Sequence, residues 1–302
     1  MASEVLRRKR ILEKLCLDIQ YIRLAEAIKY LDIPNYSPNG KRVYGEHTGS
    51  IRVLWDHLSD IGYMKDNFLL TQLHSGRVAL TTIKIGDFLR LPLDDKQALF
   101  IAGLNHDVGK FLVNYSEDGE GLFLKSERIQ LGSNEEFTPE DLEISKFHVI
   151  CGADFASNEK VIRSLILRHH FWQRNPYPTP EEIMAIEEGK CQTNPILIPR
   201  IEFLSFLLAL ADFHDATSTR PVKSKSGFLP RLEVKKRVIS EYGERQIPGD
   251  NRTAYYAAGE LVERLYEEHI FGRSNHFNPF LARNSFRWKR FSLDKLIEKL
   301  MV

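Results

Sequence analysis

Apolar residues recur at steps of three and four along most of the chain, whereas alternating strand patterns are scarce. Steps of three and four place apolar side chains on one face of a helix. Two helix starts are well marked, at Thr138-Pro139 and at Thr179-Pro180, where an N-cap threonine precedes a first-turn proline and acidic residues. The pattern therefore predicts an all-α protein.

The unusual polar residues gather in the middle of the chain. We expect a helical N-terminal segment at 1–60, a functional core at 61–225 and a helical C-terminal extension at 226–302. The amphipathic stretch at 254–271 can pack on the core or form the seam of a homodimer, and the sequence leaves both open.

Ionisable residues continue the apolar faces of several predicted helices. In the segment before "NHDVGK", Leu99, Ala102 and Gly103 define a stripe that His106 extends, and Asp107 follows at once. Four further predicted helices bring a histidine or an aspartate to such a face; one of them begins at Thr138 and runs to His148. The whole set is His74, His106, Asp107, His148, His169, His170 and Asp212.

A single histidine on an apolar face is usually a core residue that is hydrogen-bonded to a carbonyl. We keep that interpretation for His47 and His57, which have no such companions. For the set of seven, the same explanation would have to hold several times in one core. Imidazole and carboxylate groups without thiolate are typical ligands of hydrolytic and redox metals, and seven of them can hold two ions.

Composition excludes other classes. With 42 basic and 41 acidic residues the formal net charge is +1, so no overall field attracts a nucleic-acid polymer or an anionic membrane. The three cysteines are far apart and lack CxxC spacing, which argues against a disulfide framework and a thiolate zinc site. The basic start has no apolar run like that of a signal peptide, and no segment is long enough to span a bilayer. We expect a cytoplasmic protein.

The order of these motifs resembles the HD superfamily of metal-dependent phosphohydrolases, and more narrowly its HD-GYP branch. The resemblance covers residues 68–225 and implies an HD-domain helical bundle. It rests on "HSGRVA" (74–79), "NHDVGK" (105–110), "RHHFWQRNPYP" (168–178) and "ADFHDATSTRP" (211–221).

The resemblance also implies roles. Asp107 would bridge two divalent ions, iron or manganese; His74, His106 and Asp212 would complete one site, and His148, His169 and His170 the other. Asp107 and Lys110 would be the catalytic residues, with a hydroxide between the ions as the nucleophile. Cyclic di-GMP would be the substrate. Its expected contacts are Lys110, Tyr177, Arg220 and Lys223.

The chain departs from the branch in its GYP segment. Phe171 stands where a glutamate is expected, Pro176 replaces the glycine, and only Tyr177 and Pro178 keep the pattern. Some relatives bind a third metal through a glutamate one turn before the first histidine, but Leu70 occupies that position here. We therefore expect two ions.

Other functions remain open at this point. The altered GYP segment is compatible with hydrolysis of another nucleotide or phosphate ester. A signalling module with weak or no turnover is a second alternative, and it predicts little bound metal. Oxygen activation at a di-iron centre is chemically possible with the same ligands, but no residue selects it.

Overall fold

The computed structural model describes residues 69–113, 122, 125–126, 129, 135–156, 160–190, 197–219, 229–248, 255 and 257–272. Within these ranges it contains helices and no strand, which confirms the all-α class. The expected N-terminal segment lies outside them. The helices are α3 (Leu69–Phe88), α4 (Leu93–Asn105), α5 (Gly109–Leu112), α7 (Pro139–Lys146), α8 (His148–Phe155), α9 (Lys160–Arg168), α10 (Pro180–Lys190), α11 (Ile198–Thr219), α12 (Arg231–Tyr242) and α13 (Ala258–Glu267).

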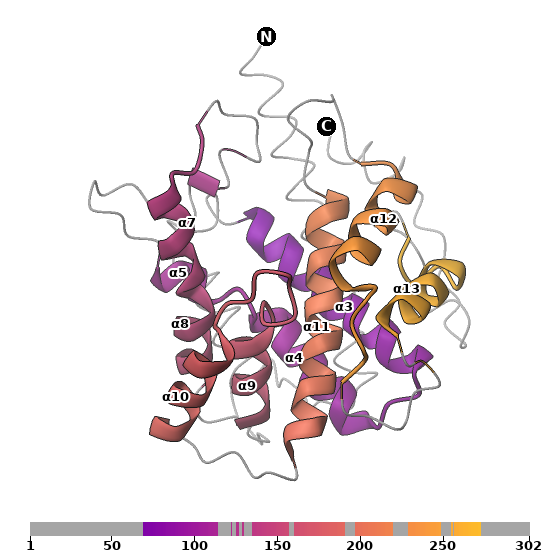
Figure 1. The fold of residues 1–302 in the computed structure, drawn as a ribbon, viewed down its shortest axis with the longest axis horizontal. Helices are drawn as coiled ribbons and strands as arrows, with labels where there is room; N and C mark the ends of the chain where they lie inside the picture. Colours follow the sequence, from indigo (N-terminus) through magenta and orange to yellow (C-terminus); the bar gives the residue numbers. More distant parts are fainter. Residues whose placement is uncertain are drawn as a thin grey trace, which may run out of the picture.

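The long helix α11 is the centre of the bundle (Figure 1). Helices α3, α4, α9 and α12 pack against α11, and α13 packs against α12. From Phe203 to Asp212 every residue of α11 is buried, because neighbouring helices cover it on all sides. A helix that is apolar around its whole circumference is expected in such a position.

Two glycines allow the helices that carry the candidate ligands to approach closely. A Cβ atom at Gly103 of α4 would lie 2.8 Å from the Cα atom of Ala79 on α3. A Cβ atom at Gly109 would overlap the main-chain oxygen of His148, where α5 meets α8. A larger residue at either position would push apart the helices that bring His74, His106 and His148 together.

Both predicted helix starts are confirmed. The Thr138 side chain accepts a hydrogen bond from the Asp141 amide at 3.1 Å, and the Thr138 amide donates to the Asp141 carboxylate at 2.8 Å. Thr179 and Glu182 form the same reciprocal pair at the start of α10. Each capping box satisfies main-chain N–H groups that the first helical turn leaves without partners.

Two helix boundaries differ from the sequence prediction. The helix expected from Thr138 through His148 is divided at Phe147, where α7 ends and α8 begins. At this junction the Nδ1 atom of His148 lies 2.6 Å from the main-chain oxygen of Ser145. Similarly, α9 ends at Arg168, so His169 and His170 lie in the turn that follows it.

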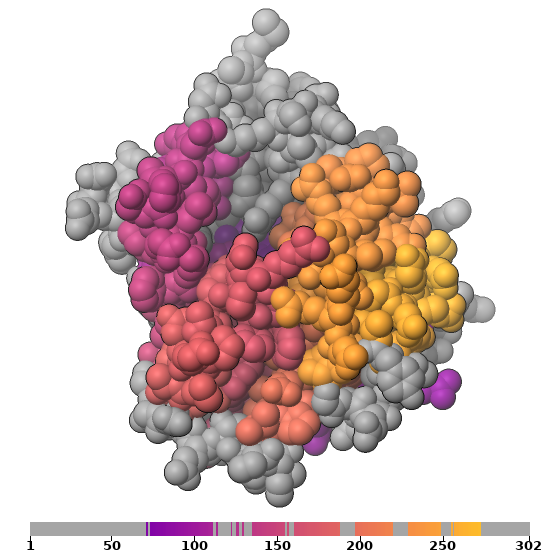
Figure 2. Space-filling model, in the orientation of Figure 1, coloured from indigo at the N-terminus to yellow at the C-terminus, as the bar shows by residue number. Residues whose placement is uncertain are grey.

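This turn is held against the end of α12. The Arg174 amide donates to Glu241 at 2.5 Å, and the Arg245 guanidinium donates to the Gln173 main-chain oxygen at 2.6 Å. Figure 2 shows the red segment of the turn beside the orange end of α12 on one face of the molecule.

Among the described residues, no helix has the length and apolar character that crossing a membrane requires.

Candidate metal centre

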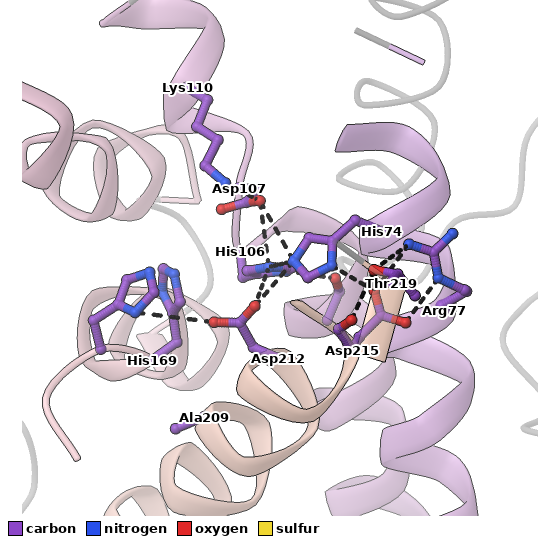
Figure 3. A network of polar contacts seen from close by, with 12 residues as sticks. His74, Arg77, His106, Asp107, Lys110, His169, Ala209, Asp212, Asp215 and Thr219 are labelled. Atoms are coloured by element: carbon purple, nitrogen blue, oxygen red, sulfur yellow. Dashed lines mark hydrogen bonds and ion pairs between the residues drawn. The ribbon is translucent and has the colours of Figure 1, made fainter. Parts of the chain in front are cut away.

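All seven predicted ligands meet at one place in the bundle. Figure 3 shows His74, His106, Asp107, His169 and Asp212 there. Helix α3 supplies His74, α8 begins at His148, and α11 supplies Asp212. The other four directly follow helix ends: His106 and Asp107 follow α4, and His169 and His170 follow α9. Six of the seven residues are buried, and His170 is partly exposed.

One part of the centre combines two imidazoles with two carboxylates. The Nε2 atoms of His74 and His106 lie 3.3 Å apart. Asp212 Oδ1 lies 2.9 Å from the first of these nitrogens and 3.6 Å from the second. Asp107 Oδ2 lies 3.7 and 3.6 Å from the same two atoms. This group matches the first ligand set implied by the resemblance.

The other part is rich in histidine. His148 Nε2 and His169 Nε2 lie 3.3 Å apart, and one ligand atom each from His148, His169 and His170 falls within 4.8 Å of the others. The His170 ring also packs on the His169 ring, with centroids 4.1 Å apart. These three residues match the second implied ligand set.

Asp107 lies between the two groups. Its Oδ2 atom faces His74 and His106, whereas its Oδ1 atom lies 3.5 Å from His148 Nε2. A carboxylate that directs its oxygens to two ligand groups can join two cations. Asp212 also reaches both sides, because its Oδ2 atom lies 3.9 Å from His170 Nδ1.

Local helix structure orients three of the histidine rings in the same way. The Nδ1 atoms of His106, His148 and His169 lie 2.8, 2.6 and 2.6 Å from main-chain oxygens three residues earlier, those of Gly103, Ser145 and Ile166. These carbonyls belong to last helical turns, where the regular ladder of amide hydrogen bonds ends. Each ring donates its Nδ1 proton there and keeps a lone pair on Nε2.

This orientation fits a metal ion. With both Nδ1 protons donated to carbonyls, neutral His148 and His169 face each other with two Nε2 lone pairs and cannot hydrogen-bond to each other. A cation between such nitrogens turns the repulsion into ligation, and a ring nitrogen bonded to a carbonyl is the usual support of a metal-binding histidine. The donor set therefore fits divalent ions.

Burial keeps the histidine-rich group neutral. It lowers the pKa of His148 to about 4 and that of His169 to about 3, and neighbouring charges modify the effect. Burial and the adjacent His169 also hold the pKa of His170 well below its ordinary value. All three rings are unprotonated near neutral pH, which is the form that binds metal.

The carboxylates are ionised for a different reason. Burial alone would raise the pKa of Asp107 and Asp212, but nearby positive charge and hydrogen bonds outweigh it and hold both values well below the ordinary range. For His74, Asp212 and Asp215 outweigh burial and raise the pKa. Binding of an ion at Nε2 of His74 therefore competes with protonation of the ring.

Two of the predicted catalytic or substrate-binding residues lie beside the centre, and two lie outside the described residues. Lys110 forms an ion pair with Asp107 Oδ2, the oxygen that faces His74 and His106. Tyr177 stacks on His170, with ring centroids 4.5 Å apart. Arg220 and Lys223 fall in the part of the chain that is not described.

Three residues that contact or support the ligands were not predicted from the sequence. Asp215 contacts Nδ1 of His74 at 2.7 Å, and Arg77 holds Asp215 through two hydrogen bonds. The Gln173 amide contacts Nδ1 of His170 at 2.7 Å. Each lies three residues after a predicted ligand, and on the helices α3 and α11 side chains at that spacing share a face. The spacing can be read from the sequence, but the contact between α3 and α11 that pairs Arg77 with Asp215 cannot.

The family comparison agrees with this geometry. Residues 71–193 match the family model of the HD domain. The HD domain match includes six of the predicted ligands and ends before Asp212, which the fold adds from α11. No match was found among curated proteins or solved structures.

The HD domain supports the superfamily of metal-dependent phosphohydrolases that the sequence resembles. The match supports a hydrolase that uses divalent metal. The histidine and aspartate groups described above could bind such metal ions. The match does not distinguish the HD-GYP branch from other HD domains.

Proposed function

We propose that the protein is a phosphodiesterase that hydrolyses cyclic di-GMP at a centre of two divalent ions. The observation that carries this proposal is the position of Asp107, whose two oxygens face two separate histidine groups. A carboxylate that directs one oxygen to each histidine group can be shared by two ions, and such a pair of ions supports hydrolysis of a phosphodiester.

We propose iron or manganese as the metal, because the ligands are imidazoles and carboxylates without thiolate. Two such ions would supply Lewis acidity at the phosphoryl group and lower the pKa of an attacking water molecule. The protein orients the ligands through helix-end carbonyls and excludes solvent from most of them. Water exclusion strengthens each charge interaction in the centre.

Lys110 is the proposed catalytic lysine. Its ammonium forms an ion pair with Asp107, and 14% of the Lys110 side chain is accessible to solvent. From this position it can contact a phosphate at the centre and offset charge that develops on the phosphoryl oxygens. Tyr177 beside His170 is a proposed contact for a base or sugar, and Arg220 and Lys223 remain proposed phosphate contacts.

A second candidate is hydrolysis of another nucleotide or phosphate ester. The turn after the double histidine favours it, because Phe171 and Pro176 replace residues that the HD-GYP branch uses. Phe171 packs edge-on against Trp172 on the hydrophobic core, so its ring serves the core and supplies no charged group. The metal requirement is the same for both candidates.

Substrate profiling tests the proposal. Protein loaded with Mn²⁺ or Fe²⁺ should hydrolyse cyclic di-GMP, and the Asp107→Asn variant should not. If the loaded protein leaves cyclic di-GMP intact but cleaves other phosphodiesters, the second candidate replaces the first. If the protein binds little metal and hydrolyses no phosphate ester, it is a signalling module that retains the fold.

A further inference from the structure

Asp215 is a buried carboxylate behind the metal centre, and no role has been assigned to it so far. We propose that Asp215, held by Arg77, is a positioning residue that orients His74 and sets the affinity of the ion that His74 binds. The inference rests on the proposed metal centre and adds a residue pair that controls one of its two sites.

His74 differs from the other ligand histidines in its place on a helix. It lies inside α3, where the carbonyls three and four residues earlier already belong to the helical hydrogen-bond ladder. His106, His148 and His169 lie next to helix ends, where the helical ladder ends and the carbonyls three residues earlier accept from Nδ1. His74 therefore needs an acceptor from another helix, and Asp215 of α11 provides it.

The contact between Asp215 and His74 defines the free nitrogen of the ring. Asp215 Oδ2 lies 2.7 Å from Nδ1 of His74, on the side of the ring opposite the metal centre. A carboxylate has only acceptor oxygens, so Nδ1 must carry a proton. Nε2 is then the nitrogen available to a cation, and it lies 2.9 Å from Asp212 Oδ1.

Arg77 fixes the carboxylate in turn. Its Nε donates to Asp215 Oδ1 at 2.7 Å and its Nη2 donates to Oδ2 at 2.9 Å. The Thr219 hydroxyl donates to the main-chain oxygen of Asp215 at 2.7 Å and lies 3.4 Å from Arg77 Nη2. A two-point guanidinium contact sets both the position and the plane of a carboxylate.

The chain offers a matched control for this pair. Asp95 is also buried and accepts a hydrogen bond from Arg200 at 2.5 Å, linking α4 to α11 as Arg77 and Asp215 link α3 to α11. Asp95 lies in the first turn of α4, at the end of the helix opposite His106. Asp95→Asn therefore removes a buried charge from an aspartate–arginine pair without touching the centre.

The test is a titration of the metal-free full chain with Mn²⁺. It measures the number of binding sites and the affinity of each site. For Asp215→Asn we expect one of the two ions to bind about 10- to 100-fold more weakly, because an amide cannot accept from His74 and both Arg77 donors. The other ion should keep its affinity. Asp95→Asn should bind both ions as the unchanged protein does, even if its melting temperature falls.

Arg77→Lys provides a second variant if Asp215→Asn does not fold, because lysine keeps the charge and loses the two-point contact. The same ion should bind more weakly, by a smaller factor. Unchanged affinity at both sites in whichever of these two variants folds would overturn the role of Asp215 while leaving the metal centre intact. If the unchanged protein binds no Mn²⁺ or Fe²⁺, the proposed function fails, and this inference fails with it.

Discussion

The Nε2 atom of His148 lies 3.3 Å from the Nε2 atom of His169, while the Nδ1 atom of each ring is engaged by a helix-end carbonyl. Two neutral rings in this arrangement direct lone pairs at each other. The pair is therefore costly in the metal-free protein and favourable when a cation lies between the rings.

The first prediction follows from that pair. Added Mn²⁺ should raise the melting temperature of the metal-free protein, because an ion that binds only the folded state stabilises it by about 2.7 kcal/mol at 100 times its dissociation constant. His169→Ala should show a smaller rise. Thermal unfolding at increasing Mn²⁺ measures both effects, and equal rises in the two proteins would exclude His169 as a ligand.

The second prediction concerns Lys110. Lys110→Ala should keep both ions and lose hydrolysis by about 100-fold or more, because its ammonium would contact the phosphate and is not a metal ligand. Elemental analysis and steady-state kinetics measure the two properties separately. Lys146→Ala, which removes an exposed lysine paired with Glu143, is the control and should change neither. Loss of metal from Lys110→Ala would give Lys110 a structural role instead.

The third prediction is a dependence of stability on pH. The folded protein keeps the pKa of His148 and His169 at about 4 and about 3, below the ordinary value of 6.5. Between these values the unfolded chain binds protons that the folded chain excludes. The free energy of unfolding of the metal-free protein should therefore fall as pH is lowered from about 6.5 towards 4.

Urea unfolding at pH 7 and pH 5, with a chelator present, measures this change. His74 acts in the opposite direction, because its raised pKa adds stability at low pH that is lost as pH rises through the folded value. His169→Gln should reduce the difference between the two pH values. A difference that stays the same in this variant would mean that other groups cause the pH dependence.

The fourth prediction tests the approach of α5 to α8. Gly109→Ala should lower the free energy of unfolding by about 1–3 kcal/mol, because its Cβ would overlap the main-chain oxygen of His148. Metal binding at the histidine-rich site should weaken as well. Gly272→Ala is the matched control, since a Cβ there would approach no described atom more closely than 3.7 Å. Similar stabilities for the two variants would contradict the close contact.

The sequence was sufficient for the helical class and for the histidines and aspartates that gather at the candidate centre. Periodicity places His106 on the face of Leu99 and Gly103 whatever the tertiary structure, and the Thr138 and Thr179 caps depend on neighbours three residues away. These features are local, so a pattern along the chain contains them.

The missed features depend on contacts between distant segments. The break at Phe147 has no glycine or proline to mark it; it occurs where the His148 ring binds the carbonyl of Ser145. The pairing of Arg77 with Asp215 joins residues 138 positions apart. Sequence spacing shows that each lies near a ligand, but only the packing of α3 against α11 brings them together.

Metal content tests the central claim most directly. We predict two ions of iron or manganese per chain in protein purified without chelator, and the loss of at least one ion, together with all hydrolysis, in Asp107→Ala. Elemental analysis of both proteins gives the answer. No bound metal in the unchanged protein, or two ions retained in Asp107→Ala, would contradict the assignment of a shared carboxylate between two metal sites.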